Sequence, residues 1–111
     1  MRVHLIKEKT VENFAHDHAL SKAAFEDWLL KIKTAVWESP QDILTTFGSA
    51  DLLGRGSKRV IFNIGGNNYR MICKYQFGEK EIHLYICWIG SHNEYDKICN
   101  KNEQYTITWK L

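Results

Sequence analysis

Residues 58–97 read KRVIFNIGGNNYRMICKYQFGEKEIHLYICWIGSHNEYDK, and this stretch decides the fold. It predicts three consecutive strands over residues 59–64, 69–77 and 81–89, since each is a short β-rich run bounded by turn residues. The Gly-Gly-Asn-Asn segment 65–68 tolerates positive φ and suits a hairpin, and residues 77–80 form a second tight turn. The stretch therefore predicts a three-stranded antiparallel meander.

A helix-start signal follows the meander. Ser91 and Glu94 have the spacing of a capping box, in which Ser is the N-cap residue and Glu follows three positions later. His92 is then the first helical residue, and Tyr95 and Asp96 share its face three and four positions on. Because the free N–H groups of a helix N-terminus favour an anion, we expect an imidazole and a phenol beside a phosphate site.

Positive charge is concentrated in the same region. The chain of 111 residues has a formal net charge of +2, yet residues 52–78 hold five basic residues and no Asp or Glu. Residues 1–51 carry six basic and eight acidic residues, and residues 79–111 carry four and five. A local field of this kind attracts a polyanion even when the net charge is small. The sequence therefore predicts an anion-binding region on the meander.

Arg70 has two interpretations. Alternation places it with Lys74 on the half-polar face of its strand, where an Arg is costly unless it faces solvent or binds an anion. The alternative is a salt bridge with a nearby carboxylate, and the residues alone leave both open. In the next strand, alternation predicts that one face holds Ile82, Leu84, Ile86 and Trp88, and the other His83, Tyr85, Cys87 and Ile89.

The N-terminal half is predicted to be largely helical. Residues 3–6 suit a short first strand, and Thr10 is a candidate N-cap for a short helix. Ser21 is expected to cap a long helix over residues 22–37. Its apolar residues fall at helical spacing; they are Phe25, Trp28, Leu29, Ile32 and Val36. Pro40 ends this helix and suits the first turn of another, whose apolar residues are Ile43, Leu44 and Phe47.

These elements predict one α+β domain over residues 1–111. The N-terminal helices pack on one face of a curved, mainly antiparallel sheet, and a short helix follows the meander. Residues 105–111 alternate in polarity and predict a final strand.

Composition excludes several classes of protein. The first twenty residues hold too many charges for a signal peptide, and no run of about 18 apolar residues is long enough to cross a membrane. The three cysteines lack metal-type spacing and are expected to be free thiols in a cytoplasmic protein. His16 and His18 suit a solvated helix terminus better than a metal site, because no further ligand has metal-like spacing. We expect no metal and no cofactor.

The order of elements, with VIFNIGGNNYR at 60–70 and IGSHNEYDK at 89–97, resembles the HigB-type toxins of the RelE superfamily. The resemblance covers roughly residues 1–100. It implies a ribosome-dependent bacterial mRNA endonuclease that works without a metal and blocks translation. It also implies a HigA-like helix-turn-helix antitoxin as partner, and operator DNA bound only through that antitoxin.

That chemistry assigns roles to the residues already singled out. The 2′-hydroxyl of RNA attacks the adjacent phosphorus, so a base, an acid and cations for the charged phosphorane are needed. His92 and Tyr95 are the predicted proton-transfer residues, and Arg70 is the predicted charge clamp. The predicted phosphate-binding residues are Arg55, Lys58, Arg59, Lys74 and Lys97.

Two other functions compete with this one. The first is a catalytically silent module that binds RNA or a partner with the same basic sheet. The second is a metal-dependent hydrolase that would use the remaining histidines, but these lack ligand spacing; they are His4, His16, His18 and His83.

Overall fold

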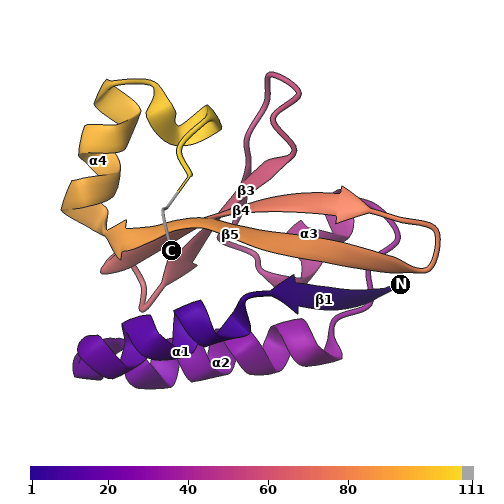
Figure 1. The fold of residues 1–111 in the computed structure, drawn as a ribbon, viewed down its shortest axis with the longest axis horizontal. Helices are drawn as coiled ribbons and strands as arrows, with labels where there is room; N and C mark the ends of the chain where they lie inside the picture. The colour runs from indigo at the N-terminus through magenta and orange to yellow at the C-terminus, as the bar shows by residue number, and fades with distance from the viewer. Residues whose placement is uncertain (109–111) are drawn as a thin grey trace.

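The computed structural model describes residues 1–108 and has a five-stranded sheet with helices on both faces (Figure 1). The strands are β1 (Arg2–Ile6), β2 (Asp51–Leu52), β3 (Arg59–Ile64), β4 (Tyr69–Phe77) and β5 (Glu81–Ser91). The helices are α1 (Glu8–Asp17), α2 (Lys22–Thr34), α3 (Gln41–Thr46) and α4 (His92–Asn100), with short 3₁₀ helices η1 (Ala19–Ser21) and η2 (Glu103–Tyr105). The strand order is β1-β5-β4-β3-β2, and only the β1–β5 pair is parallel. The predicted α+β fold with a mainly antiparallel sheet is confirmed.

The meander lies where the sequence placed it. β3 and β4 have the predicted bounds, and β5 runs two residues beyond its predicted end. Gly65 and Gly66 adopt φ of 64° and 67° in the turn between β3 and β4. L side chains rarely adopt this left-handed conformation, so the two glycines permit the turn that sets the β3–β4 register.

A β-bulge in β5 overturns part of the predicted face assignment. Ile72 of β4 pairs with Trp88, but the next residue, Cys73, pairs with Ile86, so Cys87 is an extra residue in β5. An extra residue reverses the alternation that follows it. Trp88 consequently lies on the α4 side of the sheet, and Ile89 lies in the main core, opposite to the prediction.

The main core lies between the sheet and the N-terminal helices. α1 and α2 lie side by side under one face of the sheet (Figure 1). Phe25 and Trp28 of α2 are 0% and 3% exposed, which confirms the predicted packing of this helix on the sheet. A second, smaller cluster under α4 contains Ile61, Ile72, Cys87, Trp88 and Ile98.

Three predicted helix features are wrong. α1 begins at Glu8, after Lys7 in a left-handed conformation, so Thr10 lies inside the helix. The Ser21 hydroxyl does not cap α2 but donates to the His18 carbonyl at 2.6 Å. α2 ends at Thr34 because the chain then pairs with the N-terminus: the Trp37 amide donates to the Met1 carbonyl at 2.9 Å. Val36 is therefore 60% exposed, outside the apolar stripe to which it was assigned.

The predicted last strand is also wrong for its described part. Tyr105 ends η2, and residues 106–108 form no strand. The amides of Thr106 and Ile107 donate to the Glu103 carbonyl, and the Ile107 carbonyl accepts from Arg59 Nη1, so these groups bond outside any strand ladder. Residues 109–111 of that prediction lie outside the described residues. Within the described chain, no helix combines the length and apolar character that crossing a membrane requires.

Candidate functional site

A row of polar side chains crosses the sheet on the face opposite α1 and α2. Arg59 on β3 is paired with Lys74 on β4, and Lys74 is paired with Tyr85 on β5. Tyr85 is in turn paired with Ile6, the last residue of β1. Directly paired residues carry their side chains on the same face, with Cβ atoms about 4.5–5.5 Å apart. Strand register therefore brings together residues from four strands.

This row lines a cavity of about 300 Å³. Its lining residues are Ile6, Lys7, Arg59, Lys74, Tyr85, Ile86, Cys87 and Thr108. Three of these described residues are basic and none is Asp or Glu, so the pocket favours an anion. We call it the basic pocket. Burial raises the pKa of the Cys87 thiol even though the charges of Arg59 and Lys74 act in the opposite direction. Cys87 therefore remains a neutral thiol beside the two cations.

Arg59 is held from one side. It is 7% exposed, and its Nη1 donates to the carbonyls of Ile107 at 2.7 Å and Gln104 at 3.3 Å. Lys74 is exposed on the next strand. The pocket thus combines a hydrogen-bonded guanidinium with an exposed ammonium, two cations that differ in how they bind phosphate.

Three cations around this face have an unusual backbone conformation. Lys7, Arg55 and Lys58 have φ of 62°, 61° and 56°, in the left-handed region. Such residues cost on the order of 1–3 kcal/mol each and cluster at functional sites. The strain falls on Lys7, which directly follows β1, and on Arg55 and Lys58 in the loop before β3, so these two segments are candidates for a functional role.

The predicted helix start is confirmed in detail. The Glu94 amide donates to Ser91 Oγ at 3.2 Å, and the Ser91 amide donates to Glu94 Oε1 at 2.9 Å. The backbone bond from Ser91 is the main reason why the pKa of Glu94 is lowered. His92 Nε2 lies 3.5 Å from Asp96 Oδ2, so the two residues form an exposed pair, as their spacing predicted. His92 Nδ1 is buried and has no hydrogen-bond partner within the described residues.

Tyr95 lies half-buried next to Arg70. Burial, with a hydrogen bond to Cys99, raises the pKa of Tyr95 far above its usual value, and the Arg70 charge acts in the opposite direction. The phenol therefore keeps its proton at neutral pH. Arg70 is 8% exposed and donates to the Tyr69 carbonyl and to Asn67 Oδ1, both at 3.3 Å. Among the described residues it forms no salt bridge, so the carboxylate alternative is not observed.

The structure separates the predicted site residues into groups. Arg59 and Lys74 share the basic pocket, whereas Arg70, His92 and Tyr95 gather at the start of α4. Arg70 and Lys74 are four positions apart on β4, or about 13 Å along a strand.

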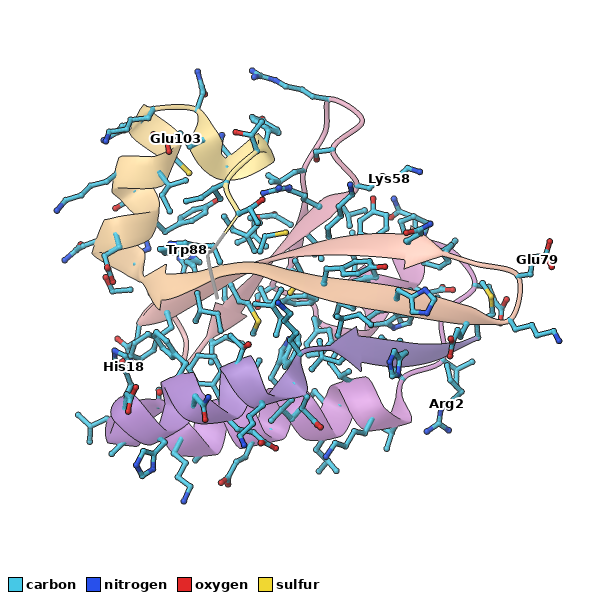
Figure 2. All side chains as sticks on the ribbon, in the orientation of Figure 1. Arg2, His18, Lys58, Glu79, Trp88 and Glu103 are labelled. Atoms are coloured by element: carbon cyan, nitrogen blue, oxygen red, sulfur yellow. The ribbon has the colours of Figure 1, made fainter. Side chains whose placement is uncertain are left out.

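The other predicted phosphate-binding residues lie elsewhere. Lys58 lines a groove with Tyr75 and Phe77, away from the basic pocket. Figure 2 shows Lys58 before β3 and Trp88 toward the α4 end of β5. Arg55 stacks on the Tyr105 ring, 4.4 Å from guanidinium carbon to ring centroid, and Lys97 is exposed on α4.

Sequence reasoning did not assign Lys7 or Tyr85 to the site, although both line the basic pocket. Tyr85 carries a detectable signal, because the tight turn after Phe77 and strand alternation place it opposite Lys74. No local sequence pattern predicts the place of Lys7, because its position depends on the parallel pairing of β1 with β5. No group of three or more described His, Cys, Asp or Glu residues is arranged to hold a metal ion.

Comparisons with known proteins agree on one family. A family model described as HigB_toxin, RelE-like toxic component of a toxin-antitoxin system, matches residues 21–98. The mRNA interferase HigB of Escherichia coli O6:H1 is 27% identical over 96 residues, which cover 86% of this chain and 91% of the relative. The mRNA interferase toxin HigB of Escherichia coli K12 and the mRNA interferase HigB of Shigella flexneri are each 27% identical over 94 residues. Those residues cover 85% of this chain and 88% of each relative.

Proposed function

The chain belongs to the HigB family of RelE-like toxins, the toxic component of a toxin-antitoxin system, and from this premise we propose that it is a ribosome-dependent mRNA endonuclease. The relatives named mRNA interferase support the reaction class. The observation that carries the proposal to this chain is the basic pocket, a single cavity lined by Lys7 just after β1, Arg59 on β3 and Lys74 on β4. Phosphate contacts of this kind give affinity with little sequence selectivity, so the ribosome supplies the position on the message.

The reaction is transesterification without a metal. The 2′-hydroxyl oxygen bonds to phosphorus while its proton passes to a base, and the bond from phosphorus to the 5′-oxygen breaks. An acid then protonates that leaving oxygen, and the products are a 2′,3′-cyclic phosphate and a free 5′-hydroxyl. The protein contributes proton transfer and stabilisation of the extra negative charge in the phosphorane.

The helix start supplies the proton-transfer residues in this proposal. His92 acts as the base through Nε2, because Nδ1 is buried. To accept the 2′-hydroxyl proton, an unprotonated Nε2 must first leave its contact with Asp96. Tyr95 keeps its proton at neutral pH, so it suits the acid or a hydrogen-bond donor and not the base. Arg70 lies next to Tyr95 and stabilises the phosphorane.

The basic pocket binds a neighbouring phosphate of the same RNA strand. About 13 Å separates Lys74 from Arg70, so the two residues contact different phosphates. Arg59 and Lys74, with Lys7 and the Tyr85 hydroxyl, hold the strand while the chemistry takes place at α4. Arg55, Lys58 and Lys97 add weaker contacts around it.

The partner in this proposal is a HigA-like helix-turn-helix antitoxin. Family membership implies an antitoxin, and the basic face favours an acidic segment of it by charge complementarity. Operator DNA is then bound through the antitoxin alone. We propose that residues 1–111 act as one domain in the bacterial cytoplasm.

Single-turnover cleavage of message on programmed ribosomes tests the proposal. Arg70→Ala is expected to slow cleavage on the order of 100-fold, as for loss of one electrostatic contact, and His92→Gln about 100- to 10,000-fold. Lys74→Ala is expected to weaken ribosome binding and to change the cleavage rate at saturating ribosome concentration little. The slope of the logarithm of the binding constant against the logarithm of salt concentration is expected to become smaller by about one. Lys80→Ala, an exposed Lys in the β4–β5 turn, is the matched control.

Three outcomes would contradict parts of the proposal. Binding to the ribosome without cleavage selects the silent binding module. Cleavage that EDTA abolishes selects a metal-dependent hydrolase. A Lys74→Ala variant that binds normally but does not cleave would move the reaction centre into the basic pocket.

A further inference from the structure

Residues 103–108 fold back from α4 onto the basic face of the sheet, and we call them the C-terminal strap. In Figure 1 this yellow segment turns from the end of α4 toward the strands. Ile107 packs against the cluster that contains Ile61 and Ile72, and Thr108 lines the basic pocket. The strap lies outside residues 21–98, the part that matches the family model. The family match therefore says nothing about the strap, and its contacts in this structure are the evidence for its role.

The strap holds Arg59 through main-chain oxygens. Both hydrogen bonds, to the carbonyls of Ile107 and Gln104, come from the same nitrogen, Nη1. A guanidinium has five N–H donors, and within the described residues the Nε and Nη2 donors of Arg59 have no hydrogen bond. Arg59 also lines the basic pocket beside Lys74. The strap thus restrains the side chain and leaves a fork of donors for a phosphate.

The strap holds Arg55 through an aromatic ring. The Arg55 guanidinium lies over Tyr105 at 4.4 Å from the ring centroid, although Arg55 itself is an exposed loop residue. Stacking uses the flat face of the guanidinium, and its N–H donors point outward from the edge. Arg55 is restrained in this way without loss of the donors that a phosphate requires.

We propose that the C-terminal strap is a positioning element that holds Arg55 and Arg59 ready for the phosphates of single-stranded RNA. Arg side chains lose conformational entropy when they bind, and restraint before binding lowers that loss. Tyr105 and Ile107 act through the two arginines and touch no substrate, so they are positioning residues. The inference rests on the proposed function, since it assumes that the bound polyanion is RNA.

A double-mutant cycle on Tyr105 and Arg55 tests the inference. The probe is a fluorescent single-stranded 2′-O-methyl oligonucleotide, which has no free 2′-hydroxyl, and its dissociation constant is measured by anisotropy at low salt. Tyr105→Ala is expected to weaken binding about two- to fivefold, the range for an exposed cation–π contact. Tyr105→Phe keeps the ring and is expected to bind like the parent. In an Arg55→Ala background, Tyr105→Ala is expected to have no further effect, which a loss of folding alone would not produce.

A second cycle covers Arg59 and gives a result if Tyr105→Ala does not fold. Ile107→Ala loosens the strap at the carbonyl that Arg59 binds, and Arg59→Lys removes the fork. The effect of Ile107→Ala is expected to disappear in the Arg59→Lys background, with melting temperatures measured for every variant.

Several results would overturn the inference. Unchanged binding by both Tyr105→Ala and Ile107→Ala would show that the strap positions nothing. Tighter binding by either would show that the strap competes with RNA for the arginines. Failure of the proposed function is separate: a parent that binds the probe and gives both cycles but cleaves no message supports the strap and refutes the endonuclease. A parent that cleaves message but shows no coupling in either double-mutant cycle supports the endonuclease and refutes the strap.

Discussion

The β5 bulge makes Gly90 intolerant of a side chain. A Cβ at this position would lie 2.3 Å from Cζ2 and 2.4 Å from Cη2 of Trp88, whose ring the bulge turns toward α4. Trp88 is 8% exposed and its ring centroid lies 6.3 Å from that of Tyr95, so Gly90→Ala must displace a packed ring. Overpacking of this kind costs about 1–3 kcal/mol. Each kcal/mol shifts the Tm of a domain of roughly 100 residues by about 4 °C or more.

Thermal and urea unfolding of Gly90→Ala measure this loss. Far-ultraviolet circular dichroism follows the helices, and tryptophan fluorescence reports on the environment of the rings that include Trp88. Gly48→Ala is the matched control, because a Cβ at Gly48 meets no atom within 4 Å. Equal unfolding free energies for Gly90→Ala and the parent would refute the placement of Trp88, and with it the bulge.

Three further predictions concern stability and thiol chemistry. Ser91→Ala removes the hydroxyl that accepts from the Glu94 amide and is expected to lower the free energy of unfolding by about 1 kcal/mol in urea titrations. Burial raises the pKa of Cys73 well above 9.0, so the folded chain holds that proton more tightly than the unfolded chain. This contribution to stability is fully present below pH 9.0 and is lost as the pH rises from there toward the higher pKa of the folded chain. Urea unfolding at neutral and alkaline pH measures the loss, and the unfolding free energy of Cys73→Ala is expected to depend less on pH. A thiol reagent is expected to modify Cys99 first and native Cys73 last, because Cys73 is buried and protonated.

Local patterns in the sequence predicted the meander and the start of α4. The strand bounds follow from the Gly-rich turn at 65–68, and the helix start follows from the Ser91–Glu94 capping box. Each signal is complete within a few residues, so no distant contact is needed to interpret it. The site residues at the helix start could be named for the same reason, although their catalytic roles stay predictions.

Long-range contacts decided what the sequence could not predict. Apolar periodicity extends α2 to Trp37, but pairing of Trp37 with Met1 ends the helix at Thr34. Alternation of residues 105–108 suggested a strand, but two carbonyls of the strap bind Arg59 instead. In both cases the deciding partner is far away in sequence, and propensity is a weak prior against such contacts.

The single extra residue in β5 determines how the functional face is divided. β4 is regular in spacing, so Arg70 and Lys74 stay on one face about 13 Å apart. β5 is irregular, because Cys87 is an extra residue. Before Cys87, Tyr85 lies on this face beside Lys74, and after Cys87, Trp88 lies on the same face beside Tyr95 of α4. Without the extra residue, Trp88 would point into the main core and α4 would lose the ring on which Tyr95 packs. The bulge therefore lets one sheet face carry both the basic pocket and the apolar cluster on which α4 packs. This arrangement places the proposed proton-transfer residues of α4 on the same face as the proposed RNA-binding pocket.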